Sequence, residues 1–107
     1  MIKHISMFRL SQSTDEPEQT EKLLFVKTQL EALPKEIDFI KESFVGTALF
    51  DVPSVSPPLL SFCDLVQILT FDTAEAAAAY PPHPAHLSLS KICSPLLSEI
   101  ASIDFEI

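Results

Sequence analysis

The sequence predicts an α+β fold in which one four-stranded antiparallel sheet carries its helices on a single face. The chain has 107 residues, 47% of them hydrophobic, which suits a single domain over residues 1–107. Apolar segments and helical patterns follow one another in the order β-α-β-β-α-β, which is that of the ferredoxin-like split βαβ unit. The second face of such a sheet needs a cover. A second copy of the chain is the simplest cover, so we expect a homodimer that closes a dimeric α/β barrel.

The first expected strand covers residues 2–10, an apolar segment that is followed by a polar cluster. Side chains alternate along a strand and therefore form two sets on opposite faces of the sheet. One set is Ile2, His4, Ser6, Phe8 and Leu10, and the other is Lys3, Ile5, Met7 and Arg9. Because both sets are substantially apolar, we expect this strand to be covered on both sides, with a second subunit on one of them.

The first expected helix begins after Thr14, which we take as the N-cap residue. Pro17 supports this start because proline is tolerated in the first turn of a helix. Pro34 is expected to end the helix. The residues at helical spacing that form its buried face are Leu23, Val26, Lys27, Leu30 and Leu33.

Two further strands are expected on either side of a proline-rich segment. Residues 37–50 and 62–71 are the apolar segments, and residues 51–60, with three prolines, are the loop between them. Gly46 is the only glycine of the chain and lies inside the first of these strands. A single glycine in a strand often marks a bulge or a bend, so we expect one of the two there.

The last third of the chain predicts a helix, a shorter helix and a strand. Asp72 as the N-cap and Glu75 three residues later form a capping box before an alanine run that continues to Tyr80. Prolines then interrupt the chain before a short helix over residues 85–97, which Pro95 weakens. Residues 100–107 are expected to form the last strand.

Composition excludes several classes of function. The formal net charge is −8, and the seven basic residues are scattered, so we expect neither nucleic-acid binding nor attraction to an anionic membrane surface. Cys63 and Cys93 form no CxxC pair and are expected to be reduced thiols. Without a recognisable signal peptide or a long apolar run, we expect a cytoplasmic protein.

One dense cluster of aromatic and ionisable residues lies between Tyr80 and His86. It contains the only tyrosine and two of the three histidines, His83 and His86, and His4 is the third histidine. A histidine base beside a phenol that donates to an oxyanion would serve proton-transfer chemistry. In the structural alternative, Tyr80 and His83 cap helices and His86 satisfies a backbone group. A metal site on His83, His86 and His4 has weak support, because no cysteine or carboxylate accompanies them at fixed spacing.

Several segments resemble the stress-responsive A/B barrel (Dabb) family. These are Met1–Ile5, Phe71–Ala76, Ala79–Tyr80, the His83-Pro84-Ala85-His86 signature and Asp104-Phe105. The resemblance implies a homodimeric ferredoxin-like barrel, and it does not imply one activity. We expect neither a cofactor nor a metal. In a plant polyketide cyclase of this family, the catalytic histidine and tyrosine match His86 and Tyr80, while His4 and Asp104 resemble supporting groups. A pocket tyrosine of that enzyme falls near Val26 and is not matched.

Two functions of different class follow. In the first, the dimer binds a small apolar or aromatic ligand or a partner in a stress-related role, without turnover. In the second, it is a cofactor-free cyclase-like enzyme with His86 as the base and Tyr80 as the oxyanion donor. Leu23, Val26 and His83 are the expected pocket residues in either case. A heme-degrading monooxygenase on the same fold is a third alternative, for which the three histidines are the candidate ligands.

Overall fold

The computed structural model describes residues 1–49 and 63–107 and confirms the expected ferredoxin-like fold, with one helix more than the basic unit. The proline-rich loop expected at residues 51–60 lies outside the described residues. No helix in the described part of the chain is both long and apolar enough to cross a membrane. The elements in chain order are β1 (Ile2–Leu10), α1 (Glu16–Glu36), β2 (Glu42–Thr47), β3 (Leu65–Phe71), α2 (Ala74–Ala79), α3 (Pro84–Cys93), the 3₁₀ turn η1 (Ser94–Leu96) and β4 (Leu97–Glu106).

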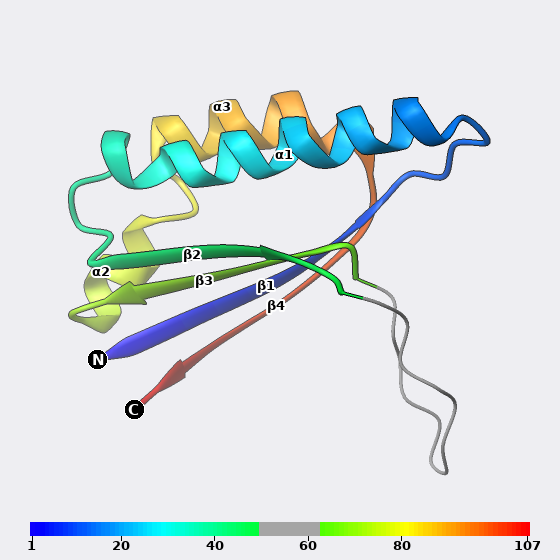
Figure 1. Ribbon diagram of the computed structural model, residues 1–107. Coiled ribbons are helices and arrows are strands. Elements are labelled where there is room, and N and C mark those ends of the chain that lie inside the picture. Colours follow the sequence, from blue (N-terminus) through cyan, green and yellow to red (C-terminus); the bar gives the residue numbers. More distant parts are fainter. Residues whose placement is uncertain (50–62) are drawn as a thin grey trace, which may run out of the picture.

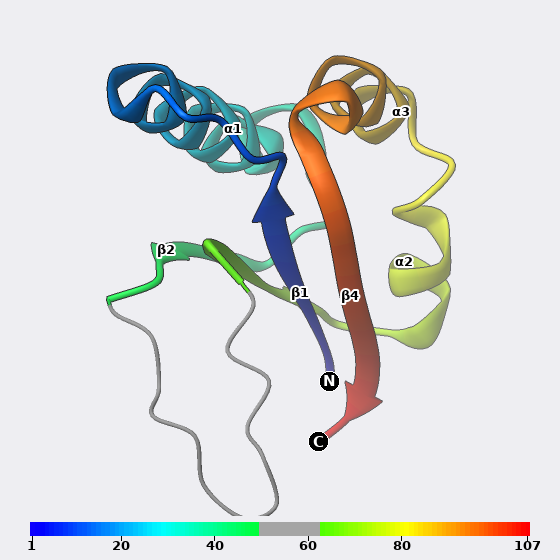
Figure 2. The ribbon, with the colours of Figure 1, turned by 90° about the vertical axis from the view of Figure 1, so that its right-hand side faces the viewer.

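The four strands form one antiparallel sheet in the order β2-β3-β1-β4. Figure 1 shows α1 and α3 lying side by side over one face of this sheet, whereas no helix covers the other face. Figure 2 shows α2 beside β4, at the edge of the sheet. The first set of β1 side chains therefore points toward the helices, and the second set points toward the uncovered face.

The hydrophobic core fills the layer between the sheet and the two long helices. On α1 the buried residues are Val26, Leu30 and Leu33, which confirms the helical face predicted from their spacing, and Leu23 packs at its margin. The fully buried side chains of the sheet include Leu10, Leu65, Leu69 and Phe71. The core thus contains one wide apolar layer, and the cavity described below lies at the side of it nearest β4.

The ends of α1 differ from the prediction. Asp15, not Thr14, is the N-cap residue, and its side chain makes no capping hydrogen bond. Pro34 does not end the helix, which continues to Glu36. A proline removes only one backbone donor, and the final turn is held by a 2.9 Å bond from Ile37 N to Leu33 O. Because Ile37 is fully buried, its packing keeps this turn in place.

Strand β2 is shorter than predicted and contains no bulge. The predicted segment began at residue 37, but Ile37 and Ile40 are buried in the connection after α1, and the ladder starts at Glu42. Gly46 pairs with Val66 in an unbroken register, so the bulge, one of the two expected features, is absent there. A Cβ added at Gly46 would lie 3.5 Å from Val66 Cγ1, an ordinary contact, so neither the register nor the available space requires a glycine.

The boundaries in the last third also shift. Thr73 caps α2 by accepting a 3.1 Å hydrogen bond from Ala76 N, whereas the predicted cap, Asp72, pairs with Lys41. Helix α3 ends at Cys93 because Pro95 lacks the N–H that the next turn needs, and a 3₁₀ turn follows. Strand β4 consequently begins at Leu97, three residues before the predicted start, and ends at Glu106.

Candidate active site

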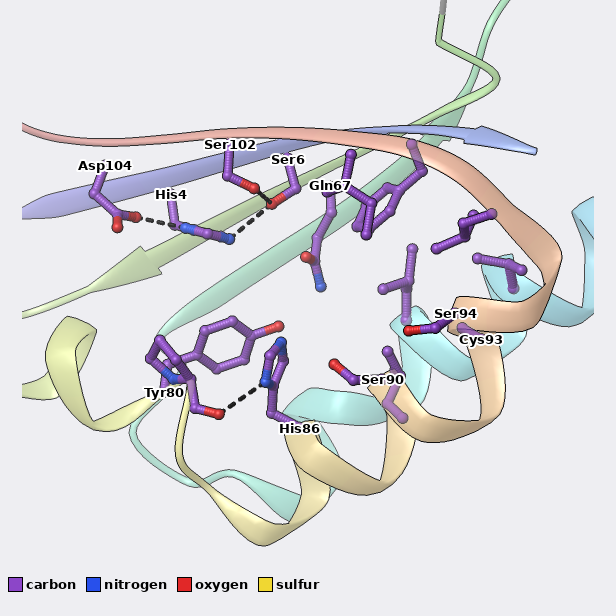
Figure 3. Close-up of a pocket in the computed structure, with 17 residues that line it drawn as sticks. His4, Ser6, Gln67, Tyr80, His86, Ser90, Cys93, Ser94, Ser102 and Asp104 are labelled. Atoms are coloured by element: carbon purple, nitrogen blue, oxygen red, sulfur yellow. Dashed lines mark hydrogen bonds and ion pairs between the residues drawn. The ribbon is translucent and has the colours of Figure 1, made fainter. Parts of the chain in front are cut away.

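A cavity of about 380 Å³ lies between the sheet and the α1–α3 layer. Its apolar wall includes Phe8, Val26, Leu30 and Leu89. Its polar residues come from three strands, from α3 and η1, and from the segment that joins α2 to α3 (Figure 3); they are His4, Ser6, Gln67, Tyr80, His86, Ser90, Ser94, Ser102 and Asp104. The lining residues of β4 are largely exposed, so the cavity opens at this edge of the sheet.

His86 lies in the first turn of α3 and has one ring nitrogen committed to the backbone. Its Nδ1–H donates a 2.9 Å hydrogen bond to the carbonyl oxygen of Pro81, since a carbonyl can only accept. In the neutral ring this bond makes Nε2 the unprotonated nitrogen. Figure 3 shows that this second nitrogen points into the cavity, where it can accept a proton from a bound molecule.

Tyr80 follows α2 directly and is 3% exposed. Its ring centroid lies 4.5 Å from that of His86 and 5.5 Å from that of His4. Burial raises the pKa of the phenol from 10.0 to about 12, and the neighbouring Gln67 side chain has a smaller effect in the opposite direction. The hydroxyl therefore keeps its proton at neutral pH and can donate a hydrogen bond to an oxygen in the cavity.

A hydrogen-bonded chain of four side chains joins β1 to β4 along the cavity wall. His4 Nδ1 donates to Asp104 Oδ1 over 2.5 Å, and His4 Nε2 lies 2.8 Å from Ser6 Oγ. Ser6 Oγ lies in turn 2.7 Å from Ser102 Oγ. The antiparallel register places His4 opposite Asp104 and Ser6 opposite Ser102, so the ladder itself brings these groups together. The His4 side chain is 13% exposed and that of Asp104 58%.

Gln67 brings an amide into the cavity from β3. The residue is 1% exposed, and its Nε2 makes no hydrogen bond of ordinary length among the described residues. Its amide interacts only weakly with the Tyr80 hydroxyl, which is the smaller effect that lowers the pKa of that phenol. Because Gln67 lines the cavity, its Nε2 donor is placed to bond to a molecule held there. Figure 3 shows the Gln67 amide and the Tyr80 hydroxyl facing the same space.

The thiol of Cys93 also lines this cavity, but it is not suited to react as a nucleophile. Burial raises the pKa of Cys93, so the group stays a neutral thiol at neutral pH and is a poor nucleophile. Among residues 1–49 and 63–107, no group of three histidine, cysteine, aspartate or glutamate side chains is placed to hold a metal ion. The ionisable and hydrogen-bonding side chains that line this cavity are histidine, phenol, carboxylate, amide, hydroxyl and thiol groups.

The sequence matches the family model of the stress responsive A/B barrel domain over residues 2–107. The chain belongs to this family. The resemblance noted at the two ends of the sequence and at the HPxH segment is thereby confirmed. No match is found among curated proteins.

Solved structures with the same fold include three informative relatives. A dimeric ferredoxin-like protein of unknown function from Bacteroides fragilis is 24% identical, with a TM-score of 0.80 and coverage of 99% of this chain and 95% of the other. The protein At3g17210 from Arabidopsis thaliana is 20% identical, with a TM-score of 0.79 and coverage of 100% and 95%. A hydroxynitrile lyase from Passiflora edulis is 17% identical, with a TM-score of 0.73 and coverage of 99% and 92%. At these identities the likeness shows the shared fold.

For this member of the A/B barrel family, the structure brings His86, Tyr80, His4, Asp104 and Val26 to the walls of one cavity. The other two expected pocket residues lie elsewhere. Leu23 is one helical turn from Val26 and packs at the margin of the core. His83 caps α3, because its Nδ1 accepts a 3.0 Å bond from Ala85 N, and its ring packs against Phe39.

Sequence reasoning did not single out Ser6, Gln67, Ser90 or Ser102 as site residues. Gln67 interrupts an otherwise apolar face of β3, and Ser6 follows His4 on a face of β1 that is otherwise apolar. A polar residue on a buried face was the available signal for both. Ser90 and Ser102 carry no such signal, because serine is ordinary on a half-buried helix or an edge strand. The pairing of β4 with β1 brings Ser102 to the cavity, and the packing of α3 over the sheet brings Ser90 there.

Proposed function

We propose that this protein is a cofactor-free acid–base enzyme acting on a small, largely apolar carbonyl compound, with His86 as the base and Tyr80 as the hydrogen-bond donor. The observation that carries the proposal is their shared cavity, in which the ring centroids of the two residues lie 4.5 Å apart. A base and an oxyanion donor on one cavity are the two groups that abstraction of a proton next to a carbonyl requires.

The mechanism assigns one task to each group. His86 Nε2 removes a proton from the carbon beside the carbonyl, while the bond from Nδ1–H to Pro81 holds the ring and supports the imidazolium that forms. The Tyr80 hydroxyl donates to the carbonyl oxygen as negative charge develops there. Because the pKa of Tyr80 is about 12, the phenol acts as a donor and does not lose its own proton.

The cavity also limits the size and polarity of the substrate. A volume of about 380 Å³ is near the lower end of the range for small-molecule sites, which is about 300–1,000 Å³. The wall opposite the polar groups consists of apolar side chains such as Val26, Leu30 and Leu89. A compound with an apolar or aromatic body and one polar reacting end fits a cavity that has one apolar wall and one polar wall.

The relatives are consistent with this type of reaction. The Passiflora edulis relative is described as a hydroxynitrile lyase. Cleavage of a hydroxynitrile removes a hydroxyl proton as a carbonyl forms, so it needs a base near the reacting oxygen. The aldol closure implied by the family resemblance needs a base near a carbon beside a carbonyl. His86 and Tyr80 could serve either reaction, so we assign the class of chemistry and not a named substrate.

Proton exchange into a probe ketone tests the proposal. Phenylacetone in deuterated water loses its α-proton signals in the NMR spectrum when a base removes them. We expect the protein to accelerate this exchange and His86→Ala to lower the acceleration by about 10²–10⁴-fold. Tyr80→Phe should lower it as well, by less. The matched control is His83→Asn, which changes a histidine outside the cavity and keeps a residue that caps helices well.

The outcome separates the two functions expected from the sequence. Exchange that depends on His86 supports the enzyme. Saturable binding of phenylacetone without accelerated exchange would reject the enzyme and leave a ligand-binding barrel. Equal exchange in the wild-type protein and His86→Ala would also reject the assignment of the base.

We further infer that the chain forms a homodimer through the uncovered face of its sheet. A row of apolar side chains crosses all four strands there, because Phe44 pairs with Ile68, Ile68 with Ile5, and Ile5 with Ile103. Phe44 and Ile103 are each 59% exposed within one chain. Large exposed apolar patches mark interaction sites, and the Bacteroides fragilis relative is described as dimeric.

Light scattering after size exclusion tests the dimer. Ile103→Asp places a charge at the β4 end of the apolar row and should convert a dimer of the wild-type chain into a monomer. Leu87→Asp is the control, because Leu87 is 55% exposed on α3, away from this face. A wild-type monomer, or a dimer that survives Ile103→Asp and not Leu87→Asp, would contradict the inference.

A further inference from the structure

The hydrogen-bonded chain on β1 and β4 has the arrangement of a nucleophilic triad. Asp104 accepts from His4 Nδ1 at 2.5 Å, and His4 Nε2 lies 2.8 Å from Ser6 Oγ. In hydrolases that use serine, histidine and aspartate, the carboxylate holds Nδ1–H so that Nε2 accepts the proton of the serine. The connectivity here is the same, atom by atom. Such triads are recognised by geometry and not by sequence order or fold.

We propose that Ser6 is a nucleophile, activated by His4 and Asp104, that takes an acyl group from a small apolar ester and passes it to water. This activity is separate from the proton transfer assigned to His86 and Tyr80, although both use the same cavity. Ser6 lines this cavity on a strand face whose neighbours Phe8 and Leu10 are buried apolar residues. The apolar wall of the cavity would receive the acyl chain.

The strand pairing explains how so short a chain builds this arrangement. His4 and Ser6 are two residues apart on β1 and therefore point to the same face of the sheet. The register sets Asp104 opposite His4 and Ser102 opposite Ser6. Ser102 Oγ, 2.7 Å from Ser6 Oγ, can donate to it and so orient the lone pairs and the proton of Ser6 toward the substrate and His4.

Two donors face the space in front of Ser6, where an oxyanion would form. The Tyr80 hydroxyl stays protonated because burial raises its pKa to about 12. Gln67 Nε2 is buried and makes no hydrogen bond of ordinary length among the described residues. Figure 3 shows both groups directed at the space between Ser6 and His86. A carbonyl oxygen placed there would receive the hydrogen bonds that acyl transfer requires.

The chemistry balances with water as the second reactant. Ser6 Oγ attacks the ester carbonyl carbon as its proton moves to His4 Nε2, and the carbonyl electron pair moves onto oxygen. The carbonyl re-forms, the bond to the alcohol oxygen breaks, and the alcohol leaves with the proton from His4. Water then attacks the acyl-serine, gives its proton to His4 and releases the carboxylic acid, and the proton returns to Ser6.

Two probes test the proposal on the full chain. p-Nitrophenyl acetate reports turnover through released nitrophenolate, and phenylmethylsulfonyl fluoride forms a stable adduct that mass spectrometry locates. We expect ester hydrolysis above the buffer rate and a single adduct on Ser6. Ser6→Ala should lose both, and Asp104→Asn and His4→Ala should slow both at least tenfold. The matched control, Ser88→Ala, removes an exposed serine of α3 that does not line this cavity.

The results separate a nucleophile from a structural serine. An adduct on Ser102, on Tyr80 or nowhere would overturn the proposal, as would labelling of Ser6 at an unchanged rate in His4→Ala. The adduct map is read on the wild-type protein and so does not depend on the folding of any variant. Ketone exchange without acylation would overturn this proposal alone, and acylation of Ser6 without ketone exchange would overturn the proposed function alone.

Discussion

The buried phenol of Tyr80 gives a prediction whose size follows from the structure. Burial raises its pKa from 10.0 in water to about 12 in the folded protein, a difference worth about 3 kcal/mol between the two protonation states. The unfolded chain therefore releases this proton at a lower pH than the folded chain. Stability from the buried neutral phenol is complete below about pH 10 and is lost as the pH rises toward 12.

At about pH 11 the expected loss is about 1 kcal/mol, because Tyr80 is then about nine-tenths ionised when unfolded and about one-tenth ionised when folded. Tyr80→Phe removes this titration. The free energy of unfolding, measured by urea titration with circular dichroism at equal protein concentration, should fall by this extra amount in the wild-type protein only. All other groups that titrate in this range are present in both proteins, so their effects cancel in the comparison.

The same group can be observed directly. Tyr80 is the only tyrosine, and the chain has no tryptophan, so tyrosinate absorbance in the near ultraviolet reports this residue alone. In folded protein at about pH 11 the signal should be small, and adding denaturant should raise it several-fold. A folded protein that already shows most of the tyrosinate signal at this pH would refute the claim that burial keeps the Tyr80 hydroxyl protonated. It would also remove Tyr80 as a protonated donor under alkaline assay conditions.

Three further predictions concern the framework around the cavity, each measured as the change in free energy of urea unfolding. Leu69→Ala in the fully buried core should lower the free energy of unfolding by about 2–5 kcal/mol, whereas Leu87→Ala on the exposed side of α3 should change it by no more than about 0.5 kcal/mol. Equal effects of the two substitutions would contradict the packing. Thr73→Ala should cost about 1 kcal/mol and Asp72→Ala clearly less, since Thr73 caps α2; the reverse order would restore the original capping assignment. Gly46→Ala should raise stability by about 0.4–1 kcal/mol, and a loss would show that the space beside Val66 is tighter than described.

Most of the fold could be predicted because its signals are local. Each signal lies within one segment of the chain: the alternation of side chains in β1, the spacing of apolar residues in α1 and the alanine run of α2. The errors were at element ends, where tertiary packing competes with local preference. Pro34 stays inside α1 because the buried Ile37 holds the last turn, and Asp72 gives up the cap of α2 while it pairs with Lys41.

The candidate site was predicted in part, and for a different reason. His86, Tyr80, His4 and Asp104 were proposed from their resemblance to a family member, and all four line one cavity. Leu23 and His83 are close to these residues in the sequence but do not line the cavity. Leu23 packs at the margin of the core, and His83 packs against Phe39. Side-chain direction at a helix margin or a loop depends on packing that spacing does not encode.

The order of elements, the helix-facing set of β1 and the aromatic–histidine cluster were present in the linear sequence, because periodicity and residue type act over short distances. The partnership of Ser6 with His4 and Asp104 was not, since it depends on residues 100 positions apart. Only the antiparallel pairing of β1 with β4 sets their register, and a shift of one residue would turn these side chains to the opposite face. The chemistry open to this protein therefore depends on long-range strand pairing, while its architecture follows from local patterns.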